Sequence, residues 1–254
     1  MCRLDARNLN TNDMYGTIPE AIGDMTSLSV LYERRTHARP AAHARARDRS
    51  LGFNEFSGSL PGSIFLLPAV TEIDMSGNAL SGELPVWWAQ GVELHSLDVS
   101  LNQLSGTIPD TVPAASHMVF LDLSVNAFRG ALPASFSNMV WLETLSLADN
   151  EITGARGAAG PCGVMLTRSA CRHSGTLPDW LGQFPDVSEL DFSNNGLSGS
   201  LPCALGNLSS LEMLSLGGNY LDSLASCAVS GQSLSMVDLG ACTLLLCCCS
   251  ACAL

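Results

Sequence analysis

Lysine is absent from this sequence of 254 residues, and all twelve basic side chains are arginines. The 24 carboxylates leave a formal net charge of −12. Nucleic-acid-binding proteins need a basic surface that neutralises phosphates, so this balance argues against a nucleic-acid partner. Phosphate-binding loops of the lysine-containing type are excluded as well. The charge is compatible with a cationic partner, although an acidic surface also simply keeps a protein soluble.

Motifs that would carry catalysis or membrane insertion are also missing. No zinc-protease, nucleophile-elbow or dinucleotide-binding pattern occurs, so we expect no enzyme, no cofactor and no metal site. The uncharged stretch 239–254 is shorter than the ~17–25 residues that span a bilayer. No apolar segment of the secretory type follows Met1. Membrane association is therefore expected only through a segment that is missing or truncated.

A repeat of 24 residues organises what is present. Its units follow the pattern L-x-x-L-x-L-x-x-N-x-L-x-G-x-[IL]-P, in which all four steps between Asn54 and Asn150 are 24 residues long. The aligned asparagines are Asn12, Asn54, Asn78, Asn102, Asn126, Asn150, Asn195 and Asn219. A last, partial unit carries Cys242 in this place. Such a repeat predicts stacked coils that bury one continuous core.

Each position of the repeat has a physical role. The pair Leu121 and Leu123 points inward from a short strand, because side chains alternate between the two faces. The asparagine amide turns inward and satisfies backbone groups of the turn. Glycine then permits a positive φ, and proline begins the return segment. The sequence predicts an α/β solenoid of about eight to nine coils, with short parallel strands on the concave face and irregular or 3-10 return segments.

Two segments interrupt the period, and removing residues 33–50 and 155–175 restores it. The first segment holds six arginines and the second holds three. We interpret both as translated non-coding sequence, since insertions seldom survive inside a buried strand. The alternative is that they are genuine disordered loops, with the first acting as a basic arm. The predicted domains are a solenoid over 1–242 that contains these inserts, and an apolar, cysteine-rich tail over 243–254.

The segments 97–109 (LDVSLNQLSGTIP) and 190–202 (LDFSNNGLSGSLP) resemble the plant-type leucine-rich repeat. This family includes ectodomains of receptor-like kinases and receptor-like proteins, and polygalacturonase inhibitors. The resemblance implies a non-catalytic scaffold that binds a protein or peptide, as a receptor-type ectodomain or a fragment of one, outside the cell or at its surface. The alternatives are an inhibitor module for a secreted hydrolase, and a cytoplasmic scaffold, which the missing signal peptide favours.

An acidic column is the candidate binding surface. The residue after the first strand leucine is an aspartate in five units, and two glutamates precede this column by two residues on the same face. These residues are Asp74, Asp98, Asp122, Asp191 and Asp238, with Glu72 and Glu189. His95, Phe120 and Met213 are expected to share the face. Stacked coils would place such side chains ~4.8 Å apart, either as a dock for a cationic partner or as solvated consensus positions.

Two further features concern covalent modification. Cys203 and Cys227 both lie eight residues past the asparagine of their unit, so they form either a disulfide between neighbouring coils or two free thiols. Asn207, in Asn-Leu-Ser, is the one glycosylation sequon and is expected off the concave face.

Overall fold

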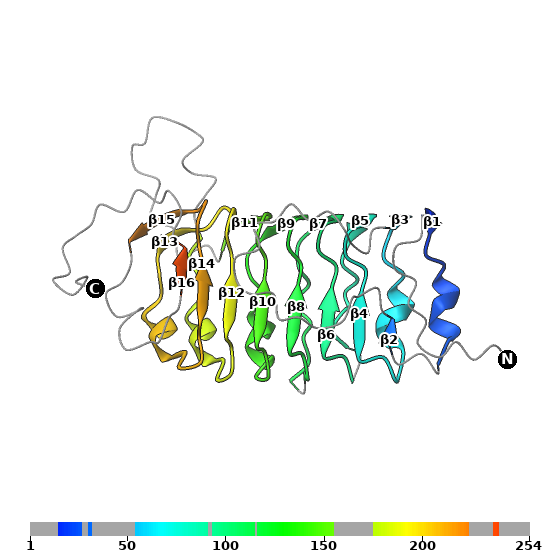
Figure 1. Ribbon diagram of the computed structural model, residues 1–254, viewed down its shortest axis with the longest axis horizontal. Helices are drawn as coiled ribbons and strands as arrows, with labels where there is room; N and C mark the ends of the chain where they lie inside the picture. The colour runs from blue at the N-terminus through cyan, green and yellow to red at the C-terminus, as the bar shows by residue number, and fades with distance from the viewer. Residues whose placement is uncertain are drawn as a thin grey trace, which may run out of the picture.

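The computed structural model describes residues 15–26, 30–31, 54–90, 93–114, 116–154, 175–223 and 236–238. These residues form a row of stacked coils, each adding one short strand to a common parallel sheet (Figure 1). The predicted α/β solenoid is confirmed. The predicted tail, most of both inserts, Asn12 and Cys227 lie outside the described residues.

The first strand of each repeat belongs to an eight-stranded sheet with the order β16-β14-β12-β10-β8-β6-β4-β2. Its members are β2 (Val30–Leu31), β4 (Glu72–Asp74), β6 (Ser96–Asp98), β8 (Phe120–Asp122), β10 (Thr144–Ser146), β12 (Glu189–Asp191), β14 (Met213–Ser215) and β16 (Met236–Asp238). All pairs are parallel and keep the repeat register, so equivalent residues of successive coils stand side by side.

A second parallel sheet, which the sequence did not lead us to expect, follows the asparagine of each coil. Its order is β1-β3-β5-β7-β9-β11, and it lies along the upper edge in Figure 1. Its strands are β1 (Tyr15–Thr17), β3 (Glu55–Gly58), β5 (Ala79–Glu83), β7 (Gln103–Gly106), β9 (Ala127–Gly130) and β11 (Glu151–Ile152). A separate pair, β13 (Ser198–Ser200) and β15 (Tyr220–Ser223), continues the arrangement. Extended residues after the asparagine meet their equivalents in the next coil, which supplies the missing hydrogen-bond partners.

The return segments contain 3-10 helices, as predicted. They are η1 (Glu20–Asp24), η2 (Gly62–Leu66), η3 (Ala134–Asn138), η5 (Asp179–Gln183) and η6 (Cys203–Asn207). Each begins directly after the proline of its repeat. The proline carbonyl accepts the first turn's hydrogen bond, as in the 3.2 Å bond from the Phe136 N–H to the Pro133 oxygen. Proline fixes φ and needs no donor at this place, which explains why the helix starts there.

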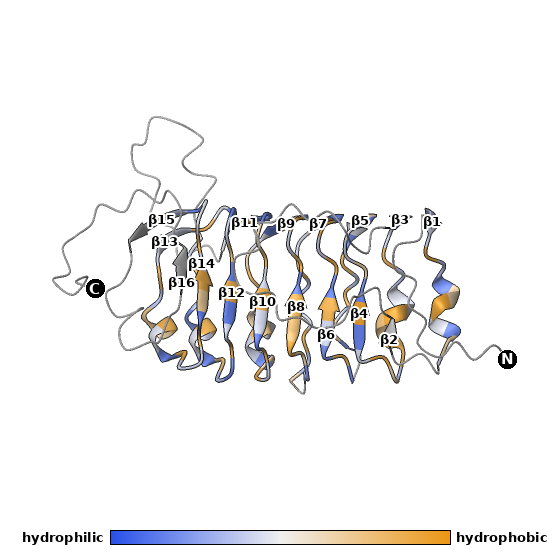
Figure 2. Cartoon of the chain, in the orientation of Figure 1, coloured by the Kyte–Doolittle hydropathy of each residue, from blue (hydrophilic) through white to orange (hydrophobic). Residues whose placement is uncertain are grey.

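One hydrophobic core runs through the coils. Leu97, Leu121 and Leu145 are fully buried at the centres of their strands, and Figure 2 shows that strands of this sheet contain both hydrophobic and hydrophilic residues. Trp88 is also fully buried and meets Phe136 edge-on, with ring centroids 6.1 Å apart. The inward side chains therefore fill the space between the sheets and the return segments, and the residues on either side of each central leucine form the outer face of the eight-stranded sheet.

Coil stacking continues across the second interruption. Thr144 of β10 pairs with Glu189 of β12, although these register positions are 45 residues apart in the sequence. The Gly175 carbonyl accepts a 2.9 Å hydrogen bond from the Ser198 N–H. Thr176 of one coil packs against Gly199 of the next, just as Thr107 packs against Gly130 two coils earlier in the stack. Thr176 thus takes the place that a residue directly after Gly154 would have in an uninterrupted repeat; the origin of the two inserts stays a hypothesis.

Candidate functional site

Four aspartates line the outer face of the eight-stranded sheet, and we call Asp74, Asp98, Asp122 and Asp191 the acidic ladder. Asp74 is in register with Asp98, and Asp98 with Asp122. Ser146 separates Asp122 from Asp191 in the same column. Strand neighbours in a sheet are ~4.8 Å apart, so three consecutive carboxylates stand beside one another. The backbone of Asp238 continues the column, but its side chain lies outside the described residues.

Each carboxylate of the ladder also closes the turn that follows its strand. The Asp98 Oδ1 accepts hydrogen bonds from the Ser100 N–H at 3.0 Å and from the Ser100 hydroxyl at 2.7 Å. Equivalent bonds run from serines 76, 124 and 193 to the Oδ1 atoms of their own coils. The four aspartates are half-buried, not exposed as the sequence led us to expect, because neighbouring coils cover their flanks.

Burial and mutual repulsion disfavour the ionised form of these groups. Burial, followed by the charges of Asp122 and Asp74, raises the pKa of Asp98 to about 7. Burial is also the main cause that raises the pKa of Asp122, with a contribution from Asp191, while the bonds from Ser124 oppose it. The pKa of Glu189 is raised by burial and then by Asp191 and Asp122. A cation placed on the ladder would relieve this repulsion, so the column is electrostatically suited to a positively charged group.

A second, mixed column lies two residues earlier on the same strands. Register places Glu72, Phe120, Glu189 and Met213 in it, all half-buried. Ser96, rather than His95, occupies this column.

His95 lies one residue before Ser96, at the edge of the sheet. There its ring stacks on His117, with centroids 5.9 Å apart. The structure thus gathers the carboxylates, Phe120 and Met213 on one face and leaves His95 beside it.

The asparagines, by contrast, point into the solenoid and hold the coils together. The Asn102 Oδ1 accepts a 3.0 Å bond from the Leu80 N–H of the preceding coil. Its Nδ2 donates to the Val99 and Ser100 carbonyls of its own coil and to the Met75 carbonyl of the preceding one. The same set recurs at Asn126, Asn150, Asn195 and Asn219. The Asn78 Oδ1 accepts a bond from the Phe56 N–H, and its Nδ2 donates to two carbonyls of its own coil. Asn54 is buried as well. The main role of these side chains is therefore structural.

The two predicted modification positions lie on the return side. Cys203 is disulfide-bonded, while its predicted partner Cys227 lies outside the described residues. Asn207 ends η6 and is exposed, as is Ser209 of the same sequon. Glycosylation of Asn207 stays a prediction, and an enzyme that modifies it would find the side chain accessible.

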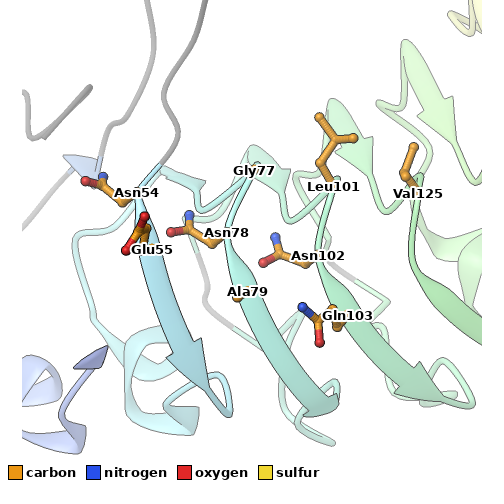
Figure 3. Close-up of a pocket in the computed structure, with 9 residues that line it drawn as sticks. All are labelled: Asn54, Glu55, Gly77, Asn78, Ala79, Leu101, Asn102, Gln103 and Val125. Carbon is orange, nitrogen blue, oxygen red and sulfur yellow. The ribbon is translucent and has the colours of Figure 1, made fainter. Parts of the chain in front are cut away.

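An open groove beside the ladder was not predicted. It lies where the two sheets meet (Figure 3) and is lined by Asn54, Glu55, Gly77, Asn78, Ala79, Leu101, Asn102, Gln103 and Val125. Leu101 and Val125 are exposed and have positive φ angles of 55° and 52°. Their position is a variable one in the repeat pattern, so the pattern does not single them out. A bulky residue directly before the asparagine is the signal that could have found them.

Within the described ranges, no group of three or more histidine, cysteine or acidic side chains is arranged to hold a metal ion. In the same part of the chain, no helix has the length and hydrophobicity that crossing a membrane requires.

Comparison with known proteins finds matches to two of the repeats. The sequence model of the Leucine Rich Repeat matches residues 93–114 and 186–208. No protein with a curated description matches the chain.

Solved structures match over most of this chain. The ectodomain of the plant membrane receptor kinase GASSHO1/SCHENGEN3 from Arabidopsis thaliana, in complex with CASPARIAN STRIP INTEGRITY FACTOR 2, is 24% identical with a TM-score of 0.66, covering 84% of this chain and 21% of that one. The plant peptide hormone receptor RGFR1 in complex with RGF2 is 27% identical with a TM-score of 0.62, covering 89% of this chain and 34% of that one. The chain therefore spans between a fifth and about a third of the length of these receptors.

The same architecture also occurs in a plant ice-binding protein, which is 23% identical with a TM-score of 0.57, covering 83% of this chain and 55% of that one. Proteins of this shape thus have different ligands. The fold alone does not identify the ligand of this chain. The ligand has to be inferred from the residues on the surface of the solenoid.

Proposed function

We propose that this chain, whose repeats match the Leucine Rich Repeat model and resemble the plant-type repeat, is a non-catalytic recognition scaffold that binds a cationic peptide or protein segment on the eight-stranded sheet. The observation that carries this proposal is the acidic ladder, in which burial and repulsion raise the pKa of Asp98 to about 7. A cationic side chain that reaches the ladder gains Coulomb attraction in a partly desolvated place, where such attraction is stronger than in water.

Within the described residues, few positive charges compete for this surface. Lysine is absent from the whole sequence, and Arg129 is the only arginine in the described ranges. Arg129 belongs to β9 of the other sheet and is exposed there. Phe120 and Met213 add half-buried apolar surface next to the carboxylates. A partner that combines basic and apolar side chains fits this face best.

A receptor-type role and a place outside the cell or at its surface form the finer part of the proposal. Two of the similar structures are plant receptors in complex with named ligands, which supports a peptide or protein partner. The exposed sequon at Asn207 is compatible with a glycoprotein. Membrane attachment and signalling would be properties of a receptor that contains this scaffold, and detection of a glycan on Asn207 in the native source would support the extracellular location.

The direct test measures binding of a synthetic octapeptide of alternating arginine and serine by isothermal titration calorimetry at pH 8 and about 50 mM salt, where charge attraction is weakly screened. The double variant Asp98→Asn, Asp122→Asn keeps an acceptor oxygen for the turn serines but removes two charges. We expect it to weaken binding roughly tenfold or more, since each desolvated charge pair contributes about 0.5–1.5 kcal/mol.

The matched control removes two carboxylates from the six-stranded sheet, in Glu83→Gln, Glu151→Gln. It changes the net charge equally and should leave affinity within about twofold. Equal losses in both double variants would show that the peptide senses only the net charge. A wild-type protein that does not bind the arginine peptide would refute the proposal.

A further inference from the structure

The residue directly before the repeat asparagine adopts the left-handed backbone conformation in six described coils. The six residues are Gly77, Leu101, Val125, Asp149, Asn194 and Gly218, with φ between 52° and 72°. Glycine, asparagine and aspartate tolerate this conformation, whereas a side chain such as leucine or a β-branched valine is strained in it. Two neighbouring coils of this protein therefore hold an unfavourable residue where the others hold a favourable one.

Core packing does not explain why leucine and valine occupy these two positions. Leu101 is 46% exposed and Val125 is 40% exposed, so neither side chain is placed in the core by its unusual backbone. Both backbones are held in position by their neighbours: the Leu101 N–H donates to the Ser124 carbonyl, and the Val125 N–H donates to the Ala148 carbonyl. Backbone strain that buries nothing is characteristic of positions kept for recognition, and an exposed apolar pair is the usual form of such a surface.

The groove of Figure 3 lies directly beside the pair. Leu101 and Val125 project from adjacent coils past the row formed by Asn54, Asn78 and Asn102. Glu55, Ala79 and Gln103 form the opposite side of the groove. The two strained residues and Ala79 give the groove apolar surface, and asparagine, glutamate and glutamine side chains border it, which suits one aliphatic side chain on an otherwise polar peptide.

The same two coils supply the negative charge. Asp98 stands three residues before Leu101, and Asp122 stands three residues before Val125. The coil of Asp74 has Gly77 at the strained position, and that of Asp191 has Asn194. Serine replaces the aspartate in the coils of Asp149 and Gly218. Among the described coils, only these two combine a ladder carboxylate with an exposed aliphatic side chain.

We propose that the groove at Leu101 and Val125 receives an aliphatic side chain of an extended peptide whose basic residues pair with Asp98 and Asp122. This inference rests on the proposed function and narrows its ligand to peptides in which basic and aliphatic residues alternate. In an extended segment, residues two apart point the same way, so one edge of the peptide can meet the carboxylates while the other meets the groove.

The test compares two octapeptides, one of alternating arginine and leucine and one of alternating arginine and serine, by isothermal titration calorimetry. Wild-type protein should bind the leucine peptide at least about tenfold more tightly. The double variant Leu101→Asn, Val125→Asn copies the residue that this chain itself uses at Asn194. It should lose the leucine preference and keep its affinity for the serine peptide.

A second readout on the same variant guards against misfolding. Asparagine relieves the backbone strain, so the variant should melt several degrees higher than the wild type while binding the leucine peptide less well. The matched control is Leu66→Asn, Val140→Asn, which removes two exposed aliphatic side chains elsewhere on the surface, where they are 58% and 44% exposed. It should keep the leucine preference.

The outcomes separate this inference from the proposed function. If the wild type binds both peptides equally, the groove has no role and the acidic ladder alone is supported. A leucine preference that survives in the groove variant, or that disappears equally in the control, overturns the inference as well. If the wild type binds neither peptide, the proposed function fails and this inference fails with it.

Discussion

Asp98 serves two purposes that oppose one another. Its Oδ1 closes the turn at Ser100, while burial and the flanking carboxylates raise its pKa from an ordinary 3.8 to about 7. Between these two pH values the folded protein binds a proton that the unfolded chain has already released. The contribution of Asp98 to stability is therefore largest below about pH 4 and falls as the pH rises towards 7.

Replacing Asp98 by asparagine should remove this pH dependence. The amide oxygen still accepts the bonds from Ser100 but carries no charge. At pH 8 we expect the variant to be more stable than the wild type by on the order of 1 kcal/mol, after allowance for solvent screening of a half-buried group. Near pH 4 the two proteins should have equal stability. Urea unfolding across this range measures the difference, and a constant offset at every pH would contradict the assignment.

Asn126 should be far less tolerant of substitution. Its side chain accepts from the Leu104 N–H and donates to the carbonyls of Val99, Leu123 and Ser124. Asn126→Ala leaves the Leu104 N–H without its acceptor, whereas the three carbonyls keep other donors, from Asn102, Asn150 and Leu101. The substitution should cost about 1–3 kcal/mol. The exposed Gln103→Ala provides the comparison and should change stability by less than about 0.5 kcal/mol. Chemical denaturation of both variants checks the contrast.

Individual residues were predictable to different degrees. The inward asparagines follow from the repeat, because a polar side chain that recurs with a structural period must satisfy a recurring backbone need. The half-burial of the acidic ladder did not follow, since it depends on how closely neighbouring coils cover Asp98 and Asp122. The strain at Leu101 and Val125 did not follow either. This strain is seen only in the backbone φ angles of the structure.

At the scale of elements, the eight-stranded sheet and the 3-10 helices could be predicted, whereas the second sheet could not. Alternating leucines mark the first strand, and proline marks the start of the helix. The Leu-Ser-Gly segment of β7 reads as a turn because glycine breaks regular structure. Its strand character comes from the neighbouring coil, where Ser105 meets Ala127 and Gly106 meets Phe128. A single repeat does not contain that information.

Removal of residues 155–175 should leave the coils intact. The deletion joins Gly154 to Thr176, whose contact with Gly199 already follows the pattern of the other coils. We expect an unchanged circular dichroism spectrum and a melting temperature at least equal to that of the full chain, because a shorter connection loses less entropy on folding. A drop of several degrees would show that the segment contributes to the fold. Deleting a whole coil, residues 103–126, is a period-preserving comparison for the spectrum.

At the scale of the whole molecule, repulsion among negative charges opposes folding. The net charge is −12, and the described ranges contain many carboxylates but a single arginine, Arg129. Self-repulsion of this kind destabilises a compact state and is screened by salt. We expect the melting temperature at pH 8 to rise by several degrees between about 20 and 300 mM sodium chloride. At pH 5 the rise should be smaller, because Asp98 is then largely protonated. Differential scanning fluorimetry at the two pH values tests both statements.

The pairing of β10 with β12 has a consequence for the integrity of the molecule. The register between these strands is held by hydrogen bonds and by buried side chains such as Leu145 and Leu190. Residues up to 154 and residues from 175 onward therefore behave as two partners that share a head-to-tail surface. A protein cut between them should stay together. Because such a surface is not closed by symmetry, the front half of one molecule can also receive the rear half of another, which makes this boundary the place where monomers would exchange parts and grow into open chains.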